Sequence, residues 1–242
     1  MGSDFSPLIK AAADNVLKAY QHKAGVLAIL LIGSAAQGNF DKYSDIDFLI
    51  IFKKKQKLTS KHYVEKSGIM VELQYFDLAE LKNYIKEEKY GLRRNASYML
   101  ADAKVILFKD KVIEDLIKSA QFNIKTKTRY SNKEIMMHLY SIDDYLGDAR
   151  RDADKGDCVA FYIDSTRVIQ NEIDLILKIN DQHSVKAKAM KALLSSLNSE
   201  FCDLLIAFNK ETAIDKRLAV LEAMKTVAVR VAGKDLADNW EI

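Results

Sequence analysis

The feature that most constrains the fold is an unbroken apolar segment, residues 26–32, that ends at Gly33. Its length is typical of a strand, and its lack of polar alternation predicts a strand that is buried on both faces. Residues 46–52, 69–76 and 105–108 form further segments of this kind. The first half of the chain therefore predicts a small mixed β-sheet with helices packed against it.

Helical periodicity accounts for most of the remaining sequence. In the first half it covers residues 8–23, 78–85 and 92–100. After residue 110, apolar side chains recur at helical spacing in residues 112–122, 133–151, 159–179, 185–197, 201–208 and 213–231. The predicted fold class is α+β: a mixed-sheet domain over residues 1–120 and an antiparallel helical bundle over residues 121–242.

Composition excludes several classes of protein. Lys and Arg number 37 and Asp and Glu 34, so a net charge of +3 argues against a nucleic-acid-coating protein. The lysine-rich stretch at residues 53–57 has few aromatic neighbours and is interpreted as a solvated loop. The two cysteines, Cys158 and Cys202, are too few for a disulfide scaffold. Without a membrane-length apolar run or a signal peptide, we expect a cytoplasmic protein that does not bind membranes.

The residues that indicate chemistry lie where the first two predicted strands meet their loops. Gly33 and Ser34 end the first strand, and Asp45-Ile46-Asp47 opens the second. Asp45 and Asp47 lie two residues apart on a strand, so their side chains point the same way. Two carboxylates beside an apolar run are unfavourable unless a cation neutralises them, and Mg²⁺ prefers such oxygen ligands. Gly33 would permit a close backbone approach to a phosphate, and Ser34 would cap a short helix beginning there.

This arrangement resembles the signature of the nucleotidyltransferase superfamily with the DNA polymerase beta type of palm. The resemblance covers roughly residues 26–108 and consists of an apolar strand, Gly33-Ser34, a spacer of about ten residues, and Asp45-Ile46-Asp47. The superfamily adds a third carboxylate from a neighbouring strand, and Glu72 matches it. The helical second half resembles the small-molecule branch, which includes aminoglycoside and lincosamide nucleotidyltransferases.

The resemblance implies a two-metal reaction. A nucleoside monophosphate, most simply AMP from ATP, would move to a hydroxyl of a small molecule, and pyrophosphate would leave. Asp45 and Asp47 would hold both Mg²⁺ ions, and Glu72 would hold the catalytic ion or activate the acceptor. Gly33 and Ser34 would bind the triphosphate. The acceptor would be an aminoglycoside- or lincosamide-like antibiotic, and the oligomeric state, a homodimer included, stays open.

Two further residues are candidates for the same site. Asp144 matches the acid that serves as general base in the aminoglycoside branch, because an aromatic residue and then a glycine follow it. The branch has a lysine four residues after that acid, whereas this chain has Asp148. Arg94 could reach the phosphates, although Arg93 and Arg94 also fit a surface position. The four histidines share no ligand spacing, which argues against zinc.

Other functions remain open alternatives. A regulatory nucleotidyltransferase that modifies a protein partner, as antitoxin-like members do, would share the motif, but such proteins usually lack a helical region of this size. A catalytically inactive nucleotide-binding module is disfavoured because all three acidic positions are filled. A nucleic-acid polymerase is disfavoured by the modest charge and the short chain.

Overall fold

The computed structural model describes residues 6–54 and 57–233 and divides the chain into two compact units. The first unit comprises Met1–Tyr90 and Arg94–Thr126, and the second comprises Gly91–Arg93 and Lys127–Ile242. The predicted division at residues 120 and 121 falls inside helix α5 (Val112–Lys125). The structural division comes after this helix because its apolar side chains, among them Ala120, belong to the core of the first unit.

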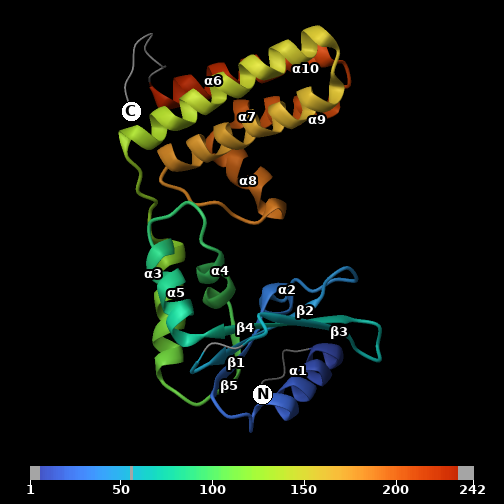
Figure 1. Cartoon of the computed structure of the whole chain (residues 1–242), viewed down its shortest axis with the longest axis vertical. Helices are drawn as coiled ribbons and strands as arrows, with labels where there is room; N and C mark the ends of the chain where they lie inside the picture. The colour runs from blue at the N-terminus through green and yellow to red at the C-terminus, as the bar shows by residue number, and fades with distance from the viewer. Residues whose placement is uncertain (1–5, 55–56, 234–242) are drawn as a thin grey trace. The chain divides into compact units, whose positions relative to one another are not determined.

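A five-stranded mixed sheet forms the centre of the first unit, in the order β3-β4-β2-β1-β5 (Figure 1). The strands are β1 (Val26–Ile32), β2 (Ile46–Phe52), β3 (Ser60–Val64), β4 (Met70–Asp77) and β5 (Lys104–Phe108). β2 and β4 pair in parallel, and the other neighbouring strands are antiparallel. The predicted mixed sheet is thus confirmed. β3 was not predicted, because it is a largely exposed edge strand without an apolar run.

Each face of the sheet has its own layer of helices. Because side chains alternate along a strand, Ile29 of β1 packs into one core and Leu30 into the other. α1 (Pro7–Tyr20) covers the first face, while α3 (Leu78–Glu88), α4 (Asn95–Ala101) and α5 belong to the core on the second face. The central strands β1 and β2 are therefore buried on both sides, as the apolar runs predict.

Local signals explain where the helices of the first unit begin. Ser6 caps α1, with Pro7 in its first turn. α4 begins at Asn95 rather than at the predicted residue 92, since the Glu88 carboxylate at the end of α3 accepts hydrogen bonds from the backbone N–H groups of Ala96 and Ser97, both at 2.8 Å. This carboxylate satisfies donors that a helix start leaves unpaired. It therefore ties α3 to α4.

The second unit is a helical bundle with one apolar core. Its helices are α6 (Asn132–Lys155), α7 (Cys158–Ile179), α8 (Ala187–Leu197), α9 (Ser199–Lys210) and α10 (Ile214–Ala232). Ser131 and Glu134 form a capping box that begins α6. The short turn at Gly156 and Asp157 makes α6 and α7 antiparallel neighbours, as Figure 1 shows. None of the helices in the described part of the chain combines the length and apolar character that a membrane crossing requires.

An ionisable residue lies within the apolar core of this bundle. Glu172 of α7 has no exposed surface, and neither of its carboxylate oxygens has a hydrogen-bond partner among the described residues. Burial raises the pKa of Glu172 well above its usual range, while the positive charge of Lys225 acts in the opposite direction. The bundle therefore favours the protonated, neutral form of this side chain.

Candidate active site

Strand register brings the three predicted carboxylates together in the first unit. Asp47 of β2 pairs with Ile32 at the end of β1 on one side and with Glu72 of β4 on the other. Asp45 stands two residues before Asp47, immediately ahead of β2. One carboxylate oxygen from each of Asp45, Asp47 and Glu72 lies within 4.8 Å of the other two. The parallel pairing of β2 with β4 is what aligns the third acid with the first two.

Gly33 allows the chain to pass close to this cluster. It has a φ of +68°, in the left-handed region that favours glycine, and it begins the short helix α2 (Gly33–Gln37). A Cβ atom at this position would stand only 2.3 Å from Oδ2 of Asp47. Glycine is thus required here both by the backbone conformation and by the space that the Asp47 carboxylate occupies.

Two neighbours position the third acid. Gln74, two residues along β4, donates a hydrogen bond from Nε2 to Oε1 of Glu72 at 3.3 Å. His62 of β3 is the cross-strand partner of Glu72, and its Nε2 lies 3.8 Å from the same oxygen. Neither residue was predicted for the site. The sequence does carry a signal for Gln74, because it lies two residues from Glu72 on the same strand. The position of His62 could not be inferred, because it depends on strand β3, which was not predicted.

The loop before β2 holds Asp45 near the cluster. The Asp41 carboxylate accepts hydrogen bonds from the backbone N–H of Tyr43 at 2.8 Å and from the Ser44 hydroxyl at 3.1 Å. The Ser44 hydroxyl in turn accepts one from the backbone N–H of Asp41 at 3.1 Å. These bonds close a compact turn that ends one residue before Asp45, which is exposed at the sheet edge.

The cluster has the chemistry of a divalent-cation site. Three carboxylates that share a small volume repel one another, and a cation between them removes this cost. All three supply hard oxygen atoms, the donors that Mg²⁺ prefers, and Mg²⁺ is held by a few carboxylates together with substrate phosphates. Asp45 is exposed while Asp47 and Glu72 are half-buried, so a phosphate-bearing ligand could approach from the solvent side.

The structure corrects the expectation for Ser34. Helix α2 begins at Gly33, with Ile32 in the cap position and no side chain capping its first turn. Ser34 lies inside the helix, where its carbonyl accepts hydrogen bonds from the N–H groups of Gly38 and Asn39. The expected serine cap is wrong because the helix begins one residue before Ser34, which places the serine after the cap position.

Arg94 occupies a structural position rather than a surface or phosphate-facing one. Its side chain is 1% exposed, and its guanidinium donates to the backbone carbonyls of Asn123 and Thr126 near the end of α5. Burial lowers the pKa of Arg94. Its neighbour Arg93 donates instead to the Asp174 carboxylate, at 2.9 and 3.0 Å, within the second unit. We therefore do not assign either arginine to the nucleotide.

Asp144 lies on α6 of the second unit and is exposed. The acids around it are engaged: Asp143 forms an ion pair with Lys225, and Asp148 forms one with Arg151. Asp148 stands where the aminoglycoside branch has a lysine, so this chain uses the position for a local ion pair. The role of Asp144 as a base stays a prediction.

Comparison with known proteins agrees with this geometry. A sequence model of the nucleotidyltransferase domain matches residues 13–131, which include the whole sheet and the three acids. The crystal structure of a nucleotidyltransferase-like protein from Exiguobacterium sibiricum 255-15 has a similar fold, with a TM-score of 0.55 at 14% sequence identity. That similarity covers 93% of this chain and 77% of the other. No curated protein sequence matched the chain. Residues 13–131 therefore form a nucleotidyltransferase domain, and this part of the chain belongs to the nucleotidyltransferase superfamily.

Proposed function

We propose that this protein transfers a nucleoside monophosphate, AMP from ATP, to a hydroxyl group of a small molecule in a Mg²⁺-dependent reaction. The observation that carries the proposal is the convergence of Asp45, Asp47 and Glu72 within 4.8 Å, beside a glycine that makes room for Asp47. In the transfer, the acceptor oxygen forms a bond to the α-phosphorus, and the bond from that phosphorus to pyrophosphate breaks. The hydroxyl proton passes to a base.

Each residue of the site has an assigned task in this proposal. Asp45 and Asp47 would hold two Mg²⁺ ions, and Glu72, oriented by Gln74, would hold the ion nearest the acceptor. Bound Mg²⁺ supplies charge neutralisation for the triphosphate and favours deprotonation of the acceptor hydroxyl. The Gly33-Ser34 segment would contact the triphosphate, since it passes directly beside Asp47.

The proposed class of acceptor molecule is argued from the sequence of the second unit. The sequence around Asp144 resembles the aminoglycoside branch of the superfamily, so we propose Asp144 as the base and an antibiotic-like polyol as the acceptor. A protein acceptor, as in regulatory members, is the competing possibility. The two differ in the product, which is a labelled small molecule in one case and a labelled polypeptide in the other.

The test follows the label from ATP. The protein is incubated with α-³²P-labelled ATP and Mg²⁺, once with a panel of aminoglycosides and lincosamides and once with cell lysate. Transfer of the label to a small molecule, with release of pyrophosphate, is the expected result. Labelled protein in the lysate, with no labelled antibiotic, would show that the acceptor is a protein rather than a small molecule. The absence of transfer in both arms would contradict the proposed reaction.

Asp47→Asn links any transfer to the acidic cluster. We expect the rate to fall at least roughly 100-fold, because metal-mediated charge stabilisation contributes several kcal/mol. Asp203→Asn on the exposed surface of α9 makes the same chemical change away from the cluster and should leave the rate unchanged. Full activity in Asp47→Asn would show that the cluster is not the metal site.

A further inference from the structure

A groove between α3 and α5 of the first unit combines positive charge with an exposed aromatic ring. It has a volume of about 590 Å³. Its walls carry four lysines, namely Lys82 and Lys86 from α3, Lys89 directly after this helix and Lys118 from α5, and one carboxylate, Asp115. The groove is separate from the acidic cluster in composition and in the elements that build it.

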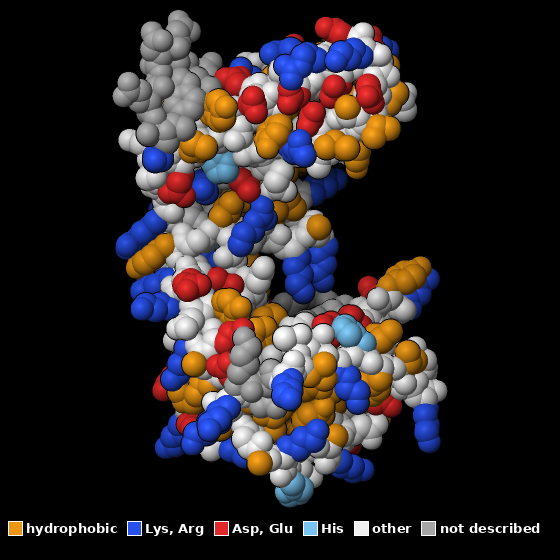
Figure 2. All heavy atoms as spheres, viewed as in Figure 1, with side chains coloured by type: hydrophobic (Ala, Val, Ile, Leu, Met, Phe, Trp, Pro, Cys, Tyr) orange, Lys and Arg blue, Asp and Glu red, His pale blue; other side chains and the backbone are white. Residues whose placement is uncertain are grey.

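The lysines of the groove have no ion-pair partners within the described residues. Elsewhere Lys127, Lys178 and Lys225 are each paired with a carboxylate. Figure 2 shows basic and acidic side chains intermixed on the face in view, whereas the lining of the groove holds four lysines and one carboxylate. A groove with four ammonium groups and one carboxylate favours an anionic ligand.

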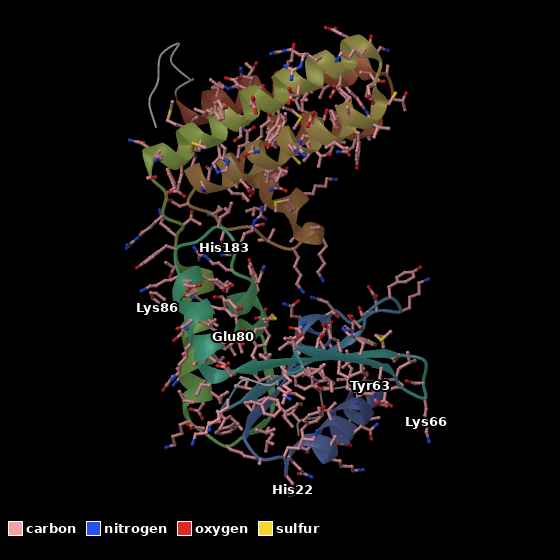
Figure 3. All side chains as sticks on the ribbon, viewed as in Figure 1. His22, Tyr63, Lys66, Glu80, Lys86 and His183 are labelled. Atoms are coloured by element: carbon pink, nitrogen blue, oxygen red, sulfur yellow. The ribbon has the colours of Figure 1, made fainter. Side chains whose placement is uncertain are left out.

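Helical spacing arranges the charge in a row. Lys82, Lys86 and Lys89 lie four and three residues apart, and Lys89, the residue that caps α3, keeps helical backbone angles, so the three lie along one side of the helix and its end. Figure 3 labels Lys86 and Glu80, which lie on opposite sides of this helix in the view. The row is about 10 Å long at a rise of 1.5 Å per residue, which matches about three phosphates at the 3.4 Å spacing of a stacked nucleic-acid strand.

An aromatic ring stands at one end of the row. Phe122 is 58% exposed, and the Lys89 ammonium lies 5.2 Å from the centre of its ring. Exposed aromatic rings beside a basic groove provide stacking platforms for unpaired bases. A duplex has no unpaired base that could stack on this ring. An acidic peptide would contact the lysines through its carboxylates and would not use the ring.

We propose that this groove binds single-stranded nucleic acid, with Lys82, Lys86, Lys89 and Lys118 contacting the phosphates and Phe122 stacking on a base. This activity does not depend on the proposed nucleotidyl transfer. The mild net charge of the chain does not oppose it, since the interaction depends on local charge.

The binding test uses fluorescein-labelled oligo(U) of twelve nucleotides and fluorescence anisotropy between 50 and 200 mM NaCl. Three to four neutralised phosphates predict a slope of log affinity against log salt of about −2 to −3. Lys82→Glu combined with Lys86→Glu should abolish measurable binding. Lys188→Glu combined with Lys191→Glu, two exposed lysines of α8, makes the same charge change and should weaken binding less than threefold.

Phe122→Leu separates stacking from charge. Because the side chain is largely exposed, the variant should fold normally, and we expect roughly tenfold weaker binding with an unchanged salt slope. A glutamate dodecapeptide serves as the competing anion. The proposal is overturned if the α8 variant weakens binding as much as the α3 variant, if Phe122→Leu has no effect, or if the peptide binds as tightly as the oligonucleotide.

Discussion

Gly33 carries two separate constraints, a left-handed backbone and the close approach of the Asp47 carboxylate. Gly33→Ala should cost about 1–2 kcal/mol of stability through backbone strain. It should also displace the Asp47 carboxylate, and therefore weaken metal binding and transfer. Thermal unfolding and titration with Mn²⁺ measure the two effects.

Gly25→Ala is the matched control for this prediction. Gly25 has a φ of +80°, but a Cβ atom there would meet no atom within 4 Å. The two variants should lose comparable stability, and only Gly33→Ala should lose metal affinity. Equal metal affinity in both would show that the contact with Asp47 has no role in the site.

Glu172 makes the stability of the protein depend on pH. Burial raises the pKa of Glu172 in the folded state. The contribution of this side chain to the stability of the fold is therefore fully present below the unfolded-state pKa of about 4.3, and it is lost as the pH rises toward the folded-state pKa. Glu172→Gln cannot ionise. The variant should therefore gain stability over the parent as the pH rises from 4 to 8, by at most ~1.4 kcal/mol per pH unit.

Urea unfolding at several pH values measures this difference. The exposed Glu114→Gln on α5 is the control and should track the parent at every pH. Parallel pH profiles for Glu172→Gln and the parent would mean that the Glu172 side chain gains a compensating partner in solution.

At the scale of elements, α4 depends on a residue from another helix. Glu88 of α3 accepts from two backbone N–H groups at the start of α4 and from the Ser97 hydroxyl at 2.9 Å. Glu88→Ala should destabilise the first unit by about 1–2 kcal/mol, the usual range for a lost helix cap. Glu87→Ala, at the exposed neighbouring position, should change the unfolding midpoint little, and equal losses would contradict a capping role.

The sequence predicts well those helices and strands whose position depends on the residues within them. The apolar run of β1 and the helical stripes of α6 and α7 are explained by local periodicity and burial. The start of α4 was misplaced because its cap lies on α3, and β3 was missed because its pairing with β4 comes from backbone register rather than from apolar side chains.

At the scale of the whole molecule, Asp144 is the one proposed catalytic residue that belongs to the second unit, whereas the acidic cluster belongs to the first. Asp144→Asn should lower the rate of transfer roughly 100-fold or more if this group is the general base, and should leave the affinity for ATP unchanged. Asp154→Asn, exposed on the same helix, is the matched control. An unchanged rate in Asp144→Asn would remove this residue from the mechanism.

The sequence predicts those residues of the candidate site that belong to the motif. Asp45 and Asp47 follow from alternation on one strand, and Glu72 follows only through the resemblance, which supplies the neighbouring strand. The placement of Arg94 was not predictable, because its hydrogen-bond acceptors lie about thirty residues away, at the C-terminal end of α5 and in the residue that caps it. The basic groove was hidden for a similar reason, since its lysines come from two helices and do not form a run in the sequence.

The pairing of β1 with β5 has a consequence for synthesis on the ribosome. Ala28 lies opposite Phe108, eighty residues later, so one edge of β1 stays unpaired until that distant strand has been translated. The helices of the second unit follow residue 131 and are not needed to close the sheet. During translation, the first unit can therefore finish its sheet while most of the bundle has yet to be made, which limits the time during which the β1 edge is open to mispairing.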